Sequence, residues 1–331
     1  MERFALAAAV VLGFALTAAL CSLFVPLRRV LERREQQQQP VQSEQPRPAP
    51  LRAPLWGGLC AAAGTVAAVG VGWLAACVGQ PELLGSEGRL MTRLLTALAG
   101  SLAFGAVGLA EDVARMRSPA ALGLRRDVRL LLEALAAAFV LLLLRAAGCL
   151  PRGLGVPGAG YVLLGSAVPF LWAVLMVTLA ECARIAERDE GTVCGAAFVA
   201  MLALMMVEAG LGVSGLAVLP GALAGALVAL GLWAFPPARL GAGCCGSLLA
   251  AGAIGCIPLS LDMTSLTVPL ALPFWAAGGL LAAQLLCAKR TGKPLRCWVK
   301  KHKMSPETVF LCSFALSAVG YVLALALLRW C

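Results

Sequence analysis

The chain has 331 residues, of which 60% are hydrophobic and only 13% charged, and its formal net charge at pH 7 is +10. So much apolar surface cannot be buried inside one water-soluble globule, so the composition excludes a soluble protein and predicts an integral membrane protein. The sequence shows no module that binds RNA or DNA, so nucleic acid is excluded as a partner. The basic residues are expected to face lipid headgroups instead.

Ten apolar stretches are long enough to cross a bilayer, since a spanning helix needs about 20 mostly apolar residues. In chain order they are expected at 4–25, 55–78, 90–110, 130–148, 161–180, 193–210, 215–235, 246–261, 267–288 and 308–330. The first stretch precedes its arginines, which is the order of a retained helix and not of a cleaved signal peptide. The predicted fold class is therefore all-α, with one polytopic membrane domain over residues 1–331.

Lysine and arginine are concentrated in the loops after the first, third, fifth, seventh and ninth stretches, which hold 21 of the 27 such residues. By the positive-inside rule these loops face the cytoplasm, and both termini lie outside. The longest polar segment, residues 26–54, is rich in glutamine and proline and has no apolar periodicity. It is predicted to be a flexible cytoplasmic loop.

The 13 cysteines lie mostly singly inside apolar stretches, where cysteine behaves as a small hydrophobic residue. No CxxC or Cys/His spacing is present, so a zinc or iron–sulfur site is not expected.

Carboxylates gather on the expected cytoplasmic face. Glu111 and Asp112 stand where the third stretch leaves the membrane, and Glu187 and Glu190 lie in the loop after the fifth. Carboxylates this close repel one another unless a cation or neighbouring arginines neutralise them. Each group taken alone is also typical of a solvated helix end or a salt-bridged loop, and that alternative stays open.

Two further segments are candidates for binding an anion. Gly243, Gly246 and Ser247 open the eighth stretch, and small residues before a helix leave N–H groups available to a phosphate. An ordinary tight turn has the same composition. Residues 289–307 hold seven basic residues and the only histidine. Lys300, Lys301 and His302 are therefore candidates to bind a nucleotide diphosphate, or they only enforce topology.

Taken together, these segments resemble in order and spacing the phospho-N-acetylmuramoyl-pentapeptide transferase family, the prenyl-phosphate phospho-sugar transferases of glycosyltransferase family 4. The resemblance spans nearly the whole chain. The family's paired aspartates fall on Glu111 and Asp112, its two lysines on Arg115 and Arg129, and its paired asparagines on Glu181 and Arg184. Its loop aspartates fall on Glu187 and Glu190, its metal-binding aspartate on Cys244, and its first histidine on His302. Its Pro-x-x-Gly-Gly element falls on Pro54, Gly57 and Gly58.

The resemblance implies Mg²⁺-dependent transfer of a phospho-sugar from a UDP-sugar to a polyprenyl phosphate such as undecaprenyl phosphate. This reaction belongs to peptidoglycan or envelope synthesis at the bacterial inner membrane. The catalytic residues would be Glu111, Asp112, Glu187 and Glu190, with Glu187 and Glu190 also holding the metal. The substrate-binding residues would be Arg115, Arg129, Gly243, Gly246, Ser247, Lys300, Lys301 and His302.

Departures from the family pattern keep two hypotheses open. The Cys244 thiol is a soft, poor ligand for magnesium, and the chain has no asparagine to supply the family's pair. The chain is therefore either a divergent transferase or a catalytically inactive paralogue without a metal. Such a paralogue would bind lipid phosphate or nucleotide in a regulatory or scaffolding role. A homodimer is left open, and a transporter is disfavoured because no line of intramembrane ionisable groups is visible.

Overall fold

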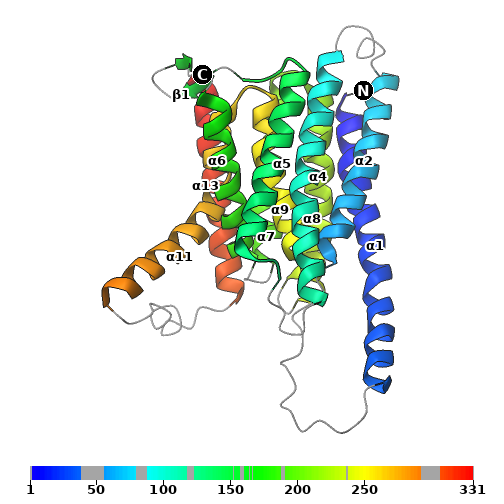
Figure 1. Ribbon diagram of the computed structural model, residues 1–331. Helices are drawn as coiled ribbons and strands as arrows, with labels where there is room; N and C mark the ends of the chain where they lie inside the picture. Colours follow the sequence, from blue (N-terminus) through cyan, green and yellow to red (C-terminus); the bar gives the residue numbers. More distant parts are fainter. Residues whose placement is uncertain are drawn as a thin grey trace.

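The protein is a bundle of long helices with a two-stranded sheet at one end, as the computed structural model shows (Figure 1). The structure describes residues 2–38, 56–79, 88–117, 123–151, 153–156, 160–163, 165, 167–187, 191–235, 238–291 and 306–330. The helices are α1 (Glu2–Gln38), α2 (Gly57–Gly79), α4 (Gly88–Arg117), α5 (Arg126–Ala146), α6 (Ala167–Ala186), α7 (Thr192–Gly210), α8 (Ser214–Ala234), α9 (Gly243–Ser260), α10 (Thr267–Leu270), α11 (Leu272–Thr291) and α13 (Pro306–Trp330).

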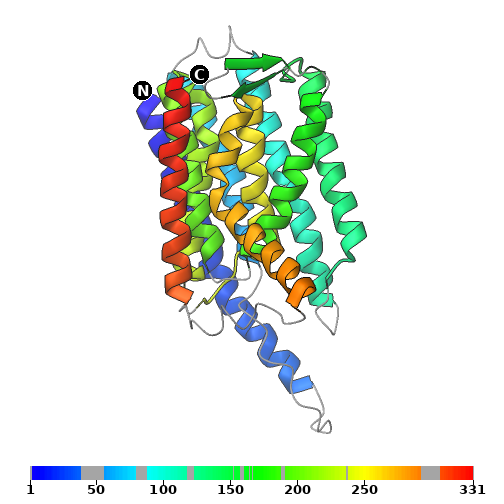
Figure 2. The same ribbon diagram turned by 90° about the vertical axis from the view of Figure 1, so that its left-hand side faces the viewer.

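Eight of the described helices are long and apolar enough to cross a membrane, namely α1, α2, α4, α6, α7, α8, α9 and α13. Each of the ten expected stretches contains a long helix, so the all-α integral membrane fold is confirmed. Both termini lie at the same end of the bundle (Figure 2), as an even number of spans requires.

The expected loop at residues 26–54 is partly helical. Helix α1 continues without a break to Gln38, so the prediction is wrong for residues 26–38. The sequence there is rich in leucine, arginine, glutamate and glutamine, which are all good helix formers. The remaining part, residues 39–54, lies outside the described residues.

The stretch expected at 161–180 does not begin as a helix. Residues 161–163 belong to the strand β2 (Gly160–Leu163), which pairs antiparallel with β1 (Gly153–Val156) and places Leu154 opposite Val162. Helix α6 begins only at Ala167. Tyrosine and valine favour extended backbone when their partners lie on a neighbouring strand, so a short hairpin displaces the predicted first turn.

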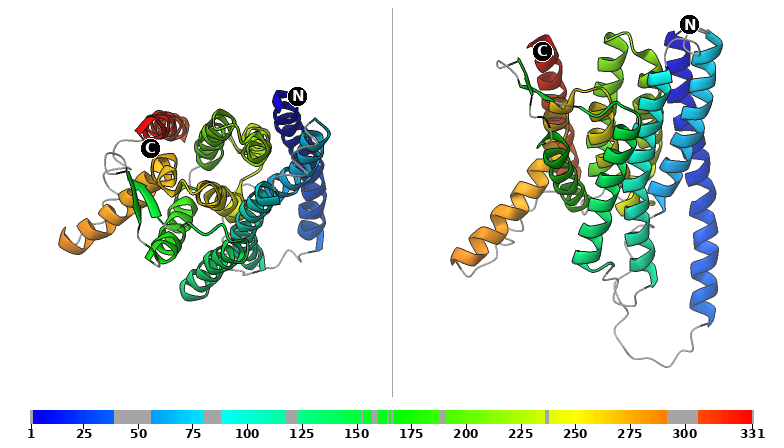
Figure 3. Two further views of the ribbon diagram at one scale, coloured as in Figure 1. Left: turned by 90° about the horizontal axis from the view of Figure 1, so that it is seen from above. Right: turned by 45° about the horizontal axis from the view of Figure 1, so that its top comes forward.

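The ninth stretch, expected as one helix at 267–288, is broken near its start. A 3₁₀ turn (Thr264–Leu266) and α10 precede α11, which begins at Leu272. The C-terminal part of α11 tilts away from the bundle (Figures 1 and 3). Pro273 explains the break, because proline lacks the N–H that would continue a helix and clashes with the preceding turn.

Helix α9 occupies the centre of the bundle, and all of its residues are buried. Seen along the bundle, it is enclosed by the other helices (Figure 3). Its first turn is held between α2 and α4 at glycines. A Cβ at Gly108 would overlap the carbonyl oxygen of Cys244, and one at Gly58 would overlap the nitrogen of Gly246. Small residues thus let three helices approach closely where the site is built.

Candidate active site: a chain of alternating charges

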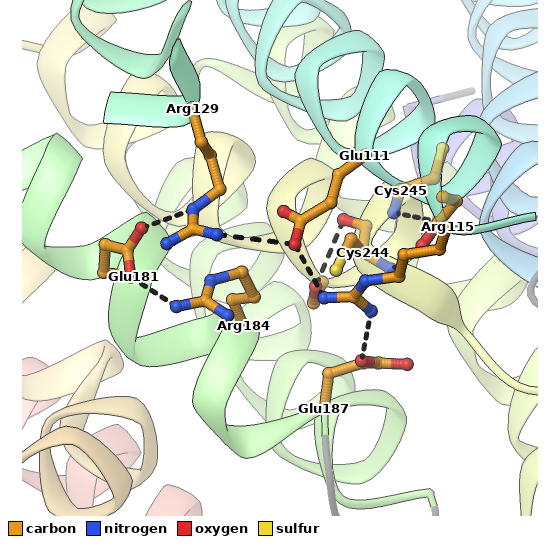
Figure 4. A network of polar contacts seen from close by, with 10 residues as sticks. Glu111, Arg115, Arg129, Glu181, Arg184, Glu187, Cys244 and Cys245 are labelled. Atoms are coloured by element: carbon orange, nitrogen blue, oxygen red, sulfur yellow. Dashed lines mark hydrogen bonds and ion pairs between the residues drawn. The ribbon is translucent and has the colours of Figure 1, made fainter. Parts of the chain in front are cut away.

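Three glutamates and three arginines meet at the end of the bundle opposite the termini (Figure 4). They come from α4, from the start of α5 and from the end of α6 with the residue that follows it. Acidic and basic side chains alternate along the contacts, in the order Glu187, Arg115, Glu111, Arg129, Glu181 and Arg184. We call these six residues the charge chain.

Glu111 lies in the middle of the charge chain. Its Oε1 accepts a hydrogen bond from Arg115 Nη2 at 2.7 Å and lies 3.5 Å from Arg129 Nη1. The side chain is only 2% exposed. Because an unpaired charged group at such a position is very unfavourable, the two guanidinium groups stabilise the buried Glu111 side chain.

Glu181 is held on both of its oxygens. Arg129 Nε donates to Oε1 at 2.8 Å, and Arg184 Nη2 donates to Oε2 at 2.6 Å. At the other end of the charge chain, Arg115 Nη1 lies 4.0 Å from Glu187 Oε2, the longest contact of the five. Arg115 is also the most exposed of the three arginines, at 23% of its side chain. It is therefore the guanidinium best placed to reach a ligand.

Asp112 is not a member of the charge chain, and its carboxylate holds the start of α9. Its Oδ1 accepts from the main-chain N–H of Cys244 at 3.0 Å, and its Oδ2 accepts from Cys245 at 2.9 Å. Its side chain is buried. A carboxylate at a helix N-terminus satisfies N–H groups that have no partner within the helix and opposes the positive end of the helix dipole.

The glycines predicted to bind phosphate shape the start of α9. Gly243 has φ +67°, a conformation that glycine adopts readily and other residues rarely do. Gly246 N–H already donates to the Ala242 carbonyl at 3.1 Å, and the buried Ser247 donates its hydroxyl to Cys244. The Gly246 N–H is thus already paired within the helix, and phosphate binding by Gly243, Gly246 and Ser247 stays a prediction.

Of the other predicted site residues, Glu187, Arg115 and Arg129 are brought together by the structure. Glu190, Lys300, Lys301 and His302 lie outside the described residues, so their roles stay predictions.

Glu133 is a site residue that the sequence reasoning missed. It lies on α5 one helical turn after Arg129, is fully buried, and has no hydrogen-bond partner on either carboxylate oxygen. Arg129, Glu181 and Arg184 are among its electrostatic neighbours. A glutamate inside an apolar stretch, four residues from an arginine and on the same helix face, is the signal that could have identified it.

The described residues do not fit a magnesium site. Magnesium requires hard oxygen ligands in near-octahedral geometry. The Asp112 carboxylate is hydrogen-bonded to the start of α9, and Glu111 and Glu181 are paired with arginines. The position of the family's metal ligand is a buried thiol, Cys244. In the part of the chain that the structure describes, no three His, Cys, Asp or Glu residues are arranged to hold a metal ion.

Fold and site together define a polytopic helical membrane protein whose ionic site is built at one end of the bundle from separate segments of the chain. More specifically, the chain belongs to glycosyl transferase family 4, whose model matches residues 94–262, about half of the chain. That range contains the whole charge chain and the start of α9.

The chain is also similar to the phospho-N-acetylmuramoyl-pentapeptide-transferase of Desulforudis audaxviator (strain MP104C). The two are 32% identical over 170 residues, which cover 48% of this chain and 50% of that relative. The chain thus spans about half the length of the curated relative it matches.

Proposed function

We propose that this protein is a divergent phospho-sugar transferase that takes a UDP-sugar and a polyprenyl phosphate as substrates. One observation carries the proposal. Side chains more than 70 positions apart in the sequence, from Glu111 to Glu187, form one continuous ionic cluster inside the region that matches the family.

The reaction is an exchange of one phosphate linkage for another. A phosphate oxygen of the polyprenyl phosphate attacks the phosphorus that carries the sugar. A new diphosphate bond to the lipid forms, the bond to the uridine-bearing phosphate breaks, and UMP leaves. Such a transfer is accelerated mainly by positioning and by neutralising the oxygens' charge.

The residues of the site are proposed to have different roles in this transfer. Arg115, partly exposed and only loosely paired with Glu187, is proposed to contact the phosphate oxygens. Both oxygens of Asp112 are occupied by α9, so Asp112 acts as a positioning residue. Lys300, Lys301 and His302 are proposed on the resemblance alone to hold the nucleotide, and Glu190 is proposed on the same basis to act with Glu187.

The transfer is tested with the purified protein in lipid nanodiscs, by chromatographic detection of UMP. We expect UMP release that requires both a UDP-sugar and polyprenyl phosphate and falls at least tenfold in Arg115→Ala. Arg117→Ala changes an exposed arginine of the same helix and serves as the matched control. Folded protein that releases no UMP from any UDP-sugar, with Mg²⁺ or with EDTA, contradicts the proposal.

A second candidate function is supported by a separate observation. Every glutamate of the charge chain has an arginine within 4.0 Å, and Cys244 replaces the family's metal-binding carboxylate. These features favour an inactive paralogue that keeps the fold and binds lipid phosphate or nucleotide. Saturable binding of either ligand without UMP release would identify this function.

We further propose a multi-pass location in the bacterial cytoplasmic membrane, with the charge chain at the cytoplasmic face. The concentration of lysine and arginine in the loops at that end supports this orientation. A homodimer stays open, and the mass of the purified particle after correction for bound detergent would decide it.

A further inference from the structure

We propose that Arg115, Arg129 and Arg184 supply the charge neutralisation that the family resemblance assigns to magnesium, so that the charge chain binds no divalent cation. The inference goes beyond the proposed function and does not depend on whether the chain turns over a substrate.

The charge balance of the cluster is the first reason. Three carboxylates alternate with three guanidinium groups, and Glu111 and Glu181 each contact two arginines. Arginine stays protonated at all physiological pH values and offers a planar set of donors that matches a carboxylate. The cluster is thus neutral as a unit without any bound cation.

The departures from the family pattern are the second reason, because they compensate one another. Glu181 and Arg184 stand where the family has two asparagines, and the structure joins them in an ion pair of 2.6 Å. Cys244 removes a carboxylate from the same end of the bundle. Compared with the family pattern, the site has gained an ion pair, which leaves its net charge unchanged, and has lost one negative charge, which reduces its need for a cation.

The oxygens left over are the third reason. Among the described residues at this site, the buried carboxylate oxygens without a hydrogen-bond partner are Oε2 of Glu111 and both oxygens of Glu133. They come from only two side chains, whereas magnesium takes about six oxygen ligands in a regular octahedron. Asp112 adds no oxygen to such a set, because both of its oxygens are bound to α9.

Binding of Mn²⁺ tests the inference directly, measured by electron paramagnetic resonance on the full chain in nanodiscs of phosphatidylcholine. We expect the wild-type protein and Glu111→Gln to bind the same amount of Mn²⁺. Equal binding above zero would place the ion outside the charge chain and supports the inference. One Mn²⁺ bound to the wild type and lost in both Glu111→Gln and Glu181→Gln would overturn it.

A second experiment makes the site dependent on metal. Arg129→Gln leaves Glu111 and Glu181 each with one arginine fewer, whereas Arg129→Lys keeps the charge. We expect millimolar Mg²⁺ to raise the melting temperature of Arg129→Gln by several degrees relative to EDTA, and to leave the wild type and Arg129→Lys unchanged. An equal rise in the wild type would contradict the inference. Neither experiment uses a substrate, so failure to observe transfer has no bearing on the result.

Discussion

The carboxylate of Asp112 on α4 accepts a hydrogen bond of 3.0 Å from the main-chain N–H of Cys244, the second residue of α9. One acid therefore joins α4, the helix that carries Glu111 and Arg115, to the central helix of the bundle. The contact is possible because Gly108, one turn earlier on the same face of α4, has no side chain to separate the two helices. The position of Asp112 against the start of α9 therefore depends on the close packing of α4 and α9 at Gly108.

Removing the Asp112 carboxylate should destabilise the protein. Each hydrogen bond to a charged group contributes about 1.5–3 kcal/mol. Asp112→Ala loses both hydrogen bonds between this carboxylate and the start of α9. We expect a clearly lower melting temperature for Asp112→Ala and a smaller loss for Asp112→Asn, which keeps one acceptor. Asp127→Asn, on the exposed first turn of α5, is the control and should melt like the wild type. Equal melting of Asp112→Ala and wild type would show that the contact contributes nothing.

The close approach of α4 and α9 predicts an asymmetry between two glycines. Gly108→Ala places a methyl group against the Cys244 carbonyl and should lower stability by about 1–3 kcal/mol, the usual effect of overpacking. Gly70→Ala meets nothing within 4 Å, so it should be neutral or slightly stabilising, because alanine favours the helix. Chemical denaturation of both variants in the same detergent measures the difference. Similar losses in both would argue against tight packing at position 108.

The ion pair between Glu181 and Arg184 should show strong coupling in a double-mutant cycle toward the family's residues. Arg184→Asn alone removes one of the two arginines that contact Glu181, and Glu181→Asn alone leaves Arg184 without its acceptor. We expect the double variant to lose less stability than the two single variants lose together, by about 0.5–3 kcal/mol, as is usual for residues in contact. Additive losses would mean that the pair contributes no mutual stabilisation.

Restoring the family's carboxylate at position 244 should make the protein respond to magnesium. Cys244→Asp places a second acid next to Asp112 inside a buried region, and like charges there are destabilising. We expect a lower melting temperature in EDTA that Mg²⁺ partly restores, with Cys244→Ser as the uncharged control. UMP release that appears only in Cys244→Asp with Mg²⁺ would show that the loss of one ligand had disabled the site. A melting temperature of Cys244→Asp unchanged in EDTA would contradict the expected repulsion.

Composition and periodicity predicted the helices well because each spanning segment must bury its apolar residues and satisfy its backbone hydrogen bonds internally. Departures occurred where other forces decide. Helix α1 continues beyond the apolar stretch because its polar residues are good helix formers, and the hairpin before α6 depends on pairing between strands that no single stretch reveals. The break before α11 depends on one proline.

The candidate site was predictable in its members more than in its contacts. Sequence order placed Glu111, Arg115 and Glu187 on one face, because alternate loops of a helical bundle share an end. It could not tell that Asp112 binds α9 while its neighbour Glu111 binds arginines, since that division depends on the rotation of α4 about its axis. Glu133 was missed because it lies within the apolar stretch, away from the loops where polar motifs were sought.

Photo-crosslinking with a diazirine-labelled short-chain polyprenyl phosphate tests most directly whether this end of the bundle binds the lipid substrate. Peptide mass spectrometry of the labelled protein should place the adducts around Arg115 at the end of α4 and around Glu187 after α6. Unlabelled polyprenyl phosphate should compete for labelling, and Arg115→Ala should reduce it. Labelling confined to the opposite end, near the β1–β2 hairpin, or labelling that unlabelled lipid does not reduce, would contradict the account.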